Sequence, residues 1–254
     1  MPTPFYHLVM AQDMLCDERL HADVRDLLLT ERPAFLFGNT APDVQTVSGQ
    51  EREETHFFSI QSPELFPAQQ VMFGKYPELA NGAMLPAQQA SFIAGYSMHL
   101  LVDQTWIREV FHPVFGSRAL WKDFPERLFL HNVLRAYLDQ RDYARLPVDM
   151  EGLLLANRSG CWLPFVRSKH LHLWRDFLAE QCAPGALVRT VEVFAERMGR
   201  KPEEFEYLLR SEDSIQDHIL SRMEPQALEK FRKSALVRSI ATLNDYLSWD
   251  SERV

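Results

Sequence analysis

His99 and Asp103, near the middle of the chain, have the types and the spacing that let two side chains bind one metal ion. On a helix, a separation of four residues brings both side chains to one face, one turn apart. The same spacing recurs at His172 and Asp176, and two such pairs are about what the composition predicts by chance. The first pair differs because it lies in a strongly apolar segment, where a buried charge must be paired or bound to a metal.

Four further residues with ligand chemistry lie in the same half of the chain: His7, Asp43, His56 and His131. Imidazole nitrogens and carboxylate oxygens are ligands that zinc accepts where thiolates are absent. Gathered in one pocket, the six residues would hold two ions and support metal-assisted hydrolysis of a phosphate ester. Taken singly, each has a simpler interpretation: Asp43 as a turn or helix cap, the histidines as ordinary core or surface residues, and His99 with Asp103 as a buried hydrogen-bonded pair.

Helical periodicity dominates the segments that must position these residues. Leucines recur at near-helical intervals over 5–29, and a nearly continuous apolar stretch predicts a buried central helix over 87–111. Within that helix, Gly95 is small enough to let a neighbouring element come close. Between the two helices, 39–62 is rich in turn-forming residues and predicts a loop that carries Asp43.

The rest of the chain continues the helical pattern. A helical turn at 51–58 would present His56, and a helix over about 123–140 carries His131. Segment 63–86 predicts short helices and turns, and 141–172 is irregular. Three amphipathic helices follow, and no segment has convincing strand periodicity, so the sequence predicts an all-α protein.

Three segments together resemble the zinc-dependent phospholipase C family, whose fold is shared with single-strand-specific zinc nucleases. They are Phe-Gly-Asn-Thr-Ala-Pro-Asp at 37–43, Thr-His-Phe-Phe at 55–58, and Ala-Gly-Tyr-Ser-Met-His-Leu-Leu-Val-Asp at 94–103. The resemblance covers about residues 5–140, in the same order. It implies a multi-helical phospholipase C/zinc nuclease-like bundle, with a metal-binding core at 1–140. Residues 141–254 would form a helical extension packed on that core as one globular unit.

The resemblance also implies a ligand set. The family's central zinc takes an aspartate from the Pro-Asp loop, a histidine from the next segment and the His-x-x-x-Asp pair, which correspond here to Asp43, His56, His99 and Asp103. A second ion shares Asp103 and takes an early histidine, which corresponds to His7. One or two zinc ions are therefore expected.

A third family ion uses a later histidine and an acid four residues after it. His131 matches that histidine, but the acid's position holds Arg135, whose guanidinium is always protonated and cannot ligate a cation. Arg135 is expected instead to hold a substrate phosphate and to stabilise transition-state charge, with Arg52 in a similar role. Asp43 would orient the attacking water or take its proton.

Composition narrows the substrate class. With 27 basic and 35 acidic residues the net charge is −8, so the basic footprint of a duplex-binding protein is missing. The expected substrate is a small phosphate ester or a lipid head group, and no apolar run is long enough for a transmembrane segment. Three scattered cysteines and an amino-terminal segment without a secretory pattern favour a cytoplasmic protein.

Two other functions remain open at this stage. The chain could retain a structural metal, or bind a ligand, without catalysing a reaction. The arginine at position 135, where the family has an acid, favours this alternative. It could also be a single-strand nuclease, although the acidic charge and the lack of interleaved aromatic and basic residues argue against this. The sequence carries no signal for oligomeric state.

Overall fold

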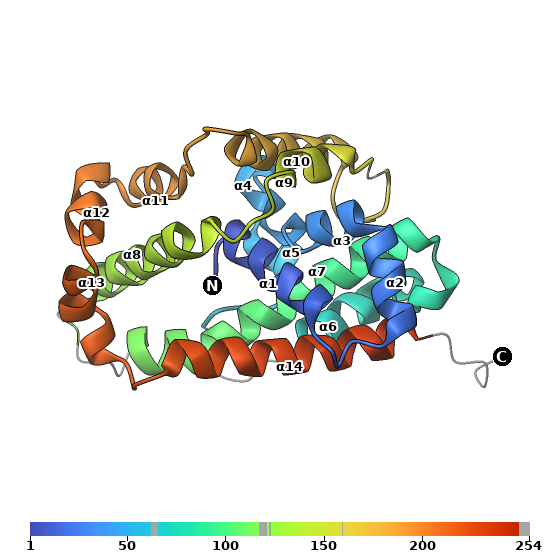
Figure 1. Ribbon diagram of the computed structural model, residues 1–254, viewed down its shortest axis with the longest axis horizontal. Coiled ribbons are helices and arrows are strands. Elements are labelled where there is room, and N and C mark those ends of the chain that lie inside the picture. The colour runs from blue at the N-terminus through green and yellow to red at the C-terminus, as the bar shows by residue number, and fades with distance from the viewer. Residues whose placement is uncertain (62–65, 117–120, 122, 159, 249–254) are drawn as a thin grey trace.

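The computed structural model describes residues 1–61, 66–116, 121, 123–158 and 160–248 (Figure 1). These residues form fourteen α-helices and no strand, which confirms the all-α class. None of the described helices has the length and apolar character needed to cross a membrane.

The first part of the chain forms α1 (Pro4–Cys16), α2 (Ala22–Thr30), α3 (Arg32–Gly38), the 3-10 helix η1 (Ala41–Val44), α4 (Gln45–Ser48), α5 (Arg52–His56), α6 (Ala68–Lys75), the 3-10 helices η2 (Pro77–Leu79) and η3 (Gly82–Met84), α7 (Ala87–Trp106), the π-helix η4 (Ile107–Phe115) and α8 (Phe124–Tyr143). The later part forms α9 (Met150–Ala156), α10 (Ser168–Cys182), α11 (Thr190–Met198), α12 (Pro202–Leu209), α13 (Glu212–His218), the 3-10 helix η5 (Leu220–Arg222) and α14 (Ala227–Leu247).

The central helix α7 is buried along most of its length, as its apolar sequence predicts. It packs most extensively against α3, and two glycines permit the close approach. A Cβ atom on Gly95 would lie 2.2 Å from the carbonyl oxygen of Phe35, and one on Gly38 would lie 2.1 Å from that of Phe92. The segment that follows α3 is therefore held against the middle of α7.

Local capping signals determine where two of the site-bearing helices begin. The hydroxyl of Thr3 accepts a hydrogen bond from the backbone N–H of Tyr6, and Pro4 follows directly at the start of α1. At the start of α8, the Asp123 carboxylate accepts from the N–H of Glu126 in the same way. These caps satisfy backbone donors that the first helical turn leaves free.

The helices after residue 140 lie against the earlier ones. α9 packs on α3, and α10 packs on η1 and α4, while α11, α12 and α13 pack along α8. Figure 1 shows α10 to α13 following the upper and left edges of the molecule, and α14 running along the lower edge. There α14 contacts α7 and α1. Late helices thus cover the elements that carry the predicted ligands.

Several boundaries differ from the sequence-based expectation. The leucine pattern over 5–29 belongs to two helices, α1 and α2, with a break between them, and Pro33 lies in the first turn of α3, where a proline is tolerated. The predicted loop 39–62 contains η1, α4 and α5. A reciprocal capping box between Glu51 and Glu54 starts α5, and Gly49, with a φ of 73°, ends α4.

Candidate metal centre and its pocket

Five of the six predicted ligands meet at one place inside the bundle. α1 contributes His7, η1 contributes Asp43, α5 contributes His56, and α7 contributes both His99 and Asp103. Four of these side chains are 0–1% exposed, whereas that of Asp43 is 19% exposed. The cluster is therefore buried on all sides except the one formed by η1.

The side-chain atoms in the outer part of the cluster have the spacing of ligands around one ion. His56 Nε2 lies 3.3 Å from His99 Nε2, 3.6 Å from Asp43 Oδ1 and 3.5 Å from Asp103 Oδ2. His99 Nε2 lies 3.6 Å from Asp103 Oδ2. Metal–ligand distances near 2.1 Å in a tetrahedral site require ligand atoms about 3.4 Å apart. The ligand atoms of Asp43, His56 and His99 all lie within 4.8 Å of one another, so these three groups could hold one metal ion.

Hydrogen bonds on the far side of each ring fix the direction of the lone pairs. The Nδ1–H of His99 donates to the carbonyl oxygen of Asn39 at 2.8 Å, and Nδ1 of His56 lies 3.0 Å from the hydroxyl of Thr55. When both Nδ1 atoms carry protons, both Nε2 lone pairs point at the same space. Two such lone pairs 3.3 Å apart repel each other unless a positive charge, a proton or a metal ion, lies between them.

The inner part of the cluster is a second group of possible ligands. Nε2 of His7 lies 3.3 Å from Asp103 Oδ1, and the His7 ring stacks on that of His99 with centroids 3.8 Å apart. Asp103 therefore faces both groups of histidines, one with each oxygen. Its Oδ2 atom also accepts a hydrogen bond from Arg52 Nη2 at 2.9 Å. This guanidinium lies over the ring of Phe58, 4.5 Å from its centroid.

The electrostatics give three residues of the cluster, His7, His56 and Asp103, the protonation states that metal ligands need. Burial lowers the pKa of His7 and that of His56 to about 4, so both rings are neutral at pH 7. Burial opposes ionisation of Asp103, but the neighbouring His99 and the hydrogen bond to His7 outweigh it and hold the pKa of Asp103 well below its usual value. Neutral imidazole and ionised carboxylate are the forms that bind divalent metals.

His99 is the one histidine of the cluster whose pKa is raised. Burial acts to lower it, but the negative charges of Asp103 and Asp43 outweigh burial. The ring therefore attracts a proton to the point where the two Nε2 lone pairs converge. A bound divalent cation would supply that positive charge instead, and would have to displace the proton.

His131 does not join this cluster. Its Nε2 atom accepts a hydrogen bond from the indole N–H of Trp106 at 2.9 Å, so that lone pair is already used. Its ring is surrounded by other aromatic side chains, with centroids 4.9 Å from Phe111 and 5.1 Å from Phe115. The structure thus supports the simpler interpretation of this residue as a hydrogen-bonded core histidine.

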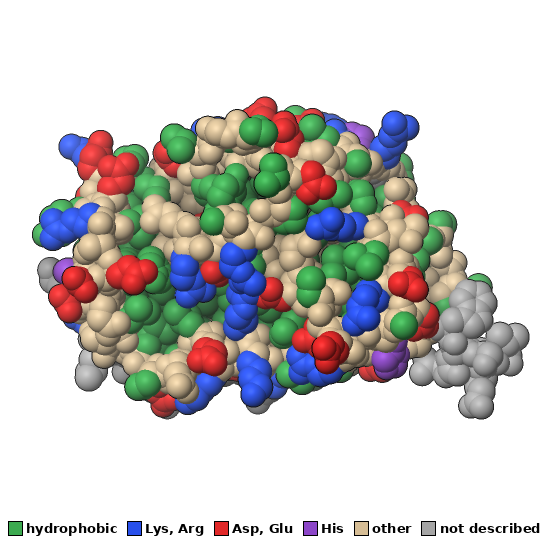
Figure 2. Space-filling model, in the orientation of Figure 1, with side chains coloured by type: hydrophobic (Ala, Val, Ile, Leu, Met, Phe, Trp, Pro, Cys, Tyr) green, Lys and Arg blue, Asp and Glu red, His purple; other side chains and the backbone are tan. Residues whose placement is uncertain are grey.

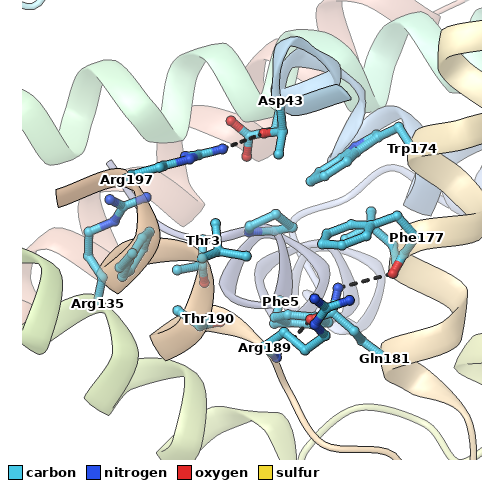
Figure 3. A pocket seen from close by; sticks show the side chains of 15 residues that line it. Thr3, Phe5, Asp43, Arg135, Trp174, Phe177, Gln181, Arg189, Thr190 and Arg197 are labelled. Carbon is cyan, nitrogen blue, oxygen red and sulfur yellow. Dashed lines mark hydrogen bonds between the residues drawn. The ribbon is translucent and has the colours of Figure 1, made fainter. Parts of the chain in front are cut away.

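Arg135 lies at a pocket that also reaches Asp43 (Figure 3). Its Nη1 donates to the side chain of Asn132 at 2.9 Å, and its guanidinium carbon lies 4.3 Å from the ring centroid of Phe194. The Nε atom is buried and has no hydrogen-bond partner among the described residues. Burial lowers the pKa of Arg135 to about 10, which leaves it charged at pH 7.

The pocket has a volume of about 470 Å³, its mouth included, and both halves of the chain build it. Two further arginines line it, Arg189 and Arg197, on either end of α11. The opposite wall includes Trp174 and Phe177 of α10, whose rings stack with centroids 5.6 Å apart. Figure 3 shows Arg135 and Arg197 on one side of the pocket and Arg189 beside Phe177 on the other.

The late helices also hold the segment that carries Asp43. The indole N–H of Trp174 donates to the carbonyl oxygen of Thr40 at 2.8 Å, and Arg197 donates to the hydroxyl of Thr46 at 2.9 Å. These bonds lie on either side of η1 in the sequence. Sequence reasoning missed Trp174, Arg189 and Arg197, since they lie in ordinary amphipathic helices without any ligand motif.

Comparisons of the chain with protein-family models, with curated proteins and with solved structures gave no match.

Proposed function

We propose that this protein is a metal-dependent phosphodiesterase of the phospholipase C type, built on a phospholipase C/zinc nuclease-like bundle. Zinc is the proposed metal, because the cluster offers imidazole and carboxylate ligand atoms within 4.8 Å of one another. A bound zinc ion would polarise a phosphoryl oxygen and lower the pKa of a coordinated water.

One observation carries the proposal: Asp43 belongs both to the ligand cluster and to the wall of the arginine-lined pocket. A hydrolase of phosphate esters needs a metal, an opening through which the ester reaches it, and positive groups for the phosphoryl charge. Of the five clustered residues, Asp43 is the one whose side chain is partly exposed. The site is thus open on the side where the arginines lie.

The residues of the chain have separate roles in this proposal. Asp43 orients the attacking water and accepts its proton, since its carboxylate faces both the cluster and the pocket. Arg135 binds a phosphoryl oxygen, because its charged guanidinium lines the pocket together with Asp43. Arg52 holds Asp103 in position through its 2.9 Å hydrogen bond, rather than contacting substrate.

A structural metal clasp is the second candidate, and the inner group of ligands favours it. His7, His99 and Asp103 are all buried, and the remaining face of Asp103 is occupied by Arg52. An ion held by these residues alone would have no route to a substrate. It would tie α1 to α7 and stabilise the fold without catalysis.

Hydrolysis of bis-p-nitrophenyl phosphate by zinc-loaded protein separates the two candidates. We expect turnover by the wild type, a loss of at least about a hundredfold in Asp43→Asn, and no change in the control Asp26→Asn. Asp26 is an exposed acid on α2 and is a matched charge removal away from the cluster. Zinc bound without turnover of this ester, lipid head-group diesters or nucleotides would establish the clasp instead.

A further inference from the structure

The arginine-lined pocket holds more positive charge than one phosphate requires. Arg135, Arg189 and Arg197 all line it, and none of them lies within 4 Å of an acidic side chain in the described part of the chain. Among the described residues that line it, the one carboxylate is that of Asp43, which also belongs to the ligand cluster. When the substrate is absent, the pocket therefore carries a net positive charge.

The arginines are spread across the pocket rather than gathered at one point. Arg135 approaches from α8, while Arg197 lies in the last turn of α11 and is tied to Thr46 beside η1. Arg189 lies at the other end of α11, where its backbone N–H donates to the side chain of Gln181. Figure 3 shows Arg189 across the pocket from Arg135 and Arg197. The position beside Arg189 therefore lies apart from the one between Asp43 and Arg135.

Apolar side chains form the wall between these positions. Phe5, Trp174, Phe177 and Leu178 line the pocket together with Val193. Such a surface binds the carbon framework of a ligand and leaves its charged ends to the arginines. The lining thus fits a molecule with an apolar middle and an anionic group at each end.

We propose that the pocket receives the part of the substrate that is not attacked, and that this part ends in a second anionic group, a carboxylate or a phosphate. This inference rests on the proposed phosphodiesterase function and names its substrate class. The phosphoryl group to be cleaved lies between Asp43 and Arg135. The second anion binds Arg189 at the far side, since a guanidinium forms two parallel hydrogen bonds to either group.

The same lining disfavours a cationic group such as choline. Quaternary ammonium ions bind proteins over open aromatic faces, and here guanidinium groups already lie over two of the rings. Arg135 lies 4.3 Å from the ring centroid of Phe194, and Arg189 lies 5.8 Å from that of Phe177. The other face of Phe177 stacks on Trp174. A cation in this pocket would meet like charge without a free aromatic cage.

Three p-nitrophenyl phosphodiesters test the inference on the zinc-loaded protein. Their second alcohols are 3-hydroxypropanoate, 3,3-dimethylbutanol and choline, which are anionic, neutral and cationic in that order. We expect kcat/KM to fall along this series, with at least about a tenfold ratio between the anionic and the cationic ester. Release of p-nitrophenolate gives one readout for all three probes.

Arg189→Gln tests whether Arg189 causes the preference for the anionic ester, and Arg210→Gln is the matched control. Arg210 is an exposed arginine that lies over Tyr207 and does not line the pocket. We expect Arg189→Gln to lower the anionic-to-cationic ratio at least about threefold, while Arg210→Gln leaves it unchanged. Equal rates for the choline and the carboxylate ester, or a ratio that Arg189→Gln does not alter, would overturn the inference and leave the phosphodiesterase function standing.

Binding calorimetry tests the anion specificity of the pocket independently of the proposed phosphodiesterase activity. If no ester is hydrolysed, the proposed function fails, and the zinc-loaded protein is titrated with 3-phosphonopropanoate and with phosphocholine. Tighter binding of the first ligand, weakened at least about threefold by Arg189→Gln, would retain the anionic specificity of the pocket. Equal affinity for both ligands would overturn that specificity as well.

Discussion

The ligand cluster and the arginine-lined pocket share Asp43 but differ in how their polar side chains find partners. The other four residues of the cluster are buried on α1, α5 and α7, and hydrogen bonds with Asn39, Thr55 and Arg52 hold His99, His56 and Asp103 in place. The two arginines of α11 are exposed and have no acidic partner among the described residues. The cluster has its polar contacts within the protein, whereas the pocket leaves its charges for a ligand.

Under the proposed function, this difference assigns the bound metal ion to the cluster and the substrate to the pocket. A preorganised set of buried ligands suits an ion that stays bound, because no rearrangement accompanies binding. Exposed arginines on one helix suit a substrate that enters and leaves. The four predictions below test this division, beginning with the largest effect.

Asp103→Asn should have the largest effect, because Asp103 faces both groups of histidines and Arg52. We expect zinc content to fall below half and hydrolysis to fall by about a thousandfold or more. Asp176→Asn is the matched control, since Asp176 has the same spacing from a histidine but is 49% exposed and paired with Arg175. Elemental analysis and the p-nitrophenyl assay measure both effects. Full zinc content in Asp103→Asn would contradict the assigned ligand set.

Arg135→Gln should lower the activity that depends on the pocket without changing zinc binding by the cluster. The variant loses a buried positive charge that faces the phosphoryl position, so kcat/KM should fall about a hundredfold, or about 2.7 kcal/mol. Zinc content should stay at the wild-type level, because Arg135 contacts Asn132 and Phe194 and, in the described part of the chain, forms no ion pair with a residue of the cluster. A loss of zinc together with activity would mean that the two regions are not independent.

Gly95→Ala should disturb the cluster indirectly, by forcing α7 and α3 apart. The new Cβ would meet the carbonyl oxygen of Phe35 and the backbone of Asn39, which holds His99. We expect a loss of about 1–3 kcal/mol in the free energy of unfolding, together with weaker zinc binding. The control is Gly152→Ala on α9, where nothing lies within 4 Å of a Cβ and the change should stabilise the helix by about 0.5–1 kcal/mol. Equal unfolding free energies for the two variants in urea would contradict the close-packing argument.

Asp139→Asn tests the frame of the pocket by its pH dependence. Thr3, just before α1, and Thr190, in α11, both line the pocket, and their hydroxyls donate to this buried carboxylate, whose pKa burial raises to about 7. A raised acid stabilises the fold fully below its unfolded pKa near 4, and this contribution is lost as pH rises to 7.

The stability of Asp139→Asn relative to wild type should therefore improve by up to a few kcal/mol between pH 4 and pH 8. Urea unfolding of both proteins across this range measures the change. The control Asp245→Asn removes an exposed carboxyl on α14, away from the pocket. A difference in stability between Asp139→Asn and wild type that stays constant with pH would show that the Asp139 carboxyl does not titrate between those values.

The sequence predicted the core of the cluster because its chemistry is local. His99 and Asp103 are one helical turn apart in an apolar helix, and Gly95 marks the close approach of α3. The same reasoning could not separate His131 from the ligands, since a stripe of apolar neighbours surrounds a core histidine and a metal ligand alike. The contact with Trp106 that distinguishes them is tertiary.

The pocket could not be predicted, because its lining depends on how distant helices pack. Arg189 and Arg197 are two among many charged residues in the late amphipathic helices, and no spacing in the sequence relates them to Asp43. Segment 39–62 has the composition of a loop, yet it forms η1, α4 and α5. The bond from Trp174 to Thr40 and the contacts of α10 with η1 hold it in place.

The most direct test of the central claim is the metal content of the purified protein after dialysis against metal-free buffer and reconstitution with zinc. The convergence of the Nε2 atoms of His56 and His99 predicts at least one tightly bound zinc ion per chain, absent from the double variant His56→Ala/His99→Ala. A correctly folded wild type that retains no divalent metal would contradict the account.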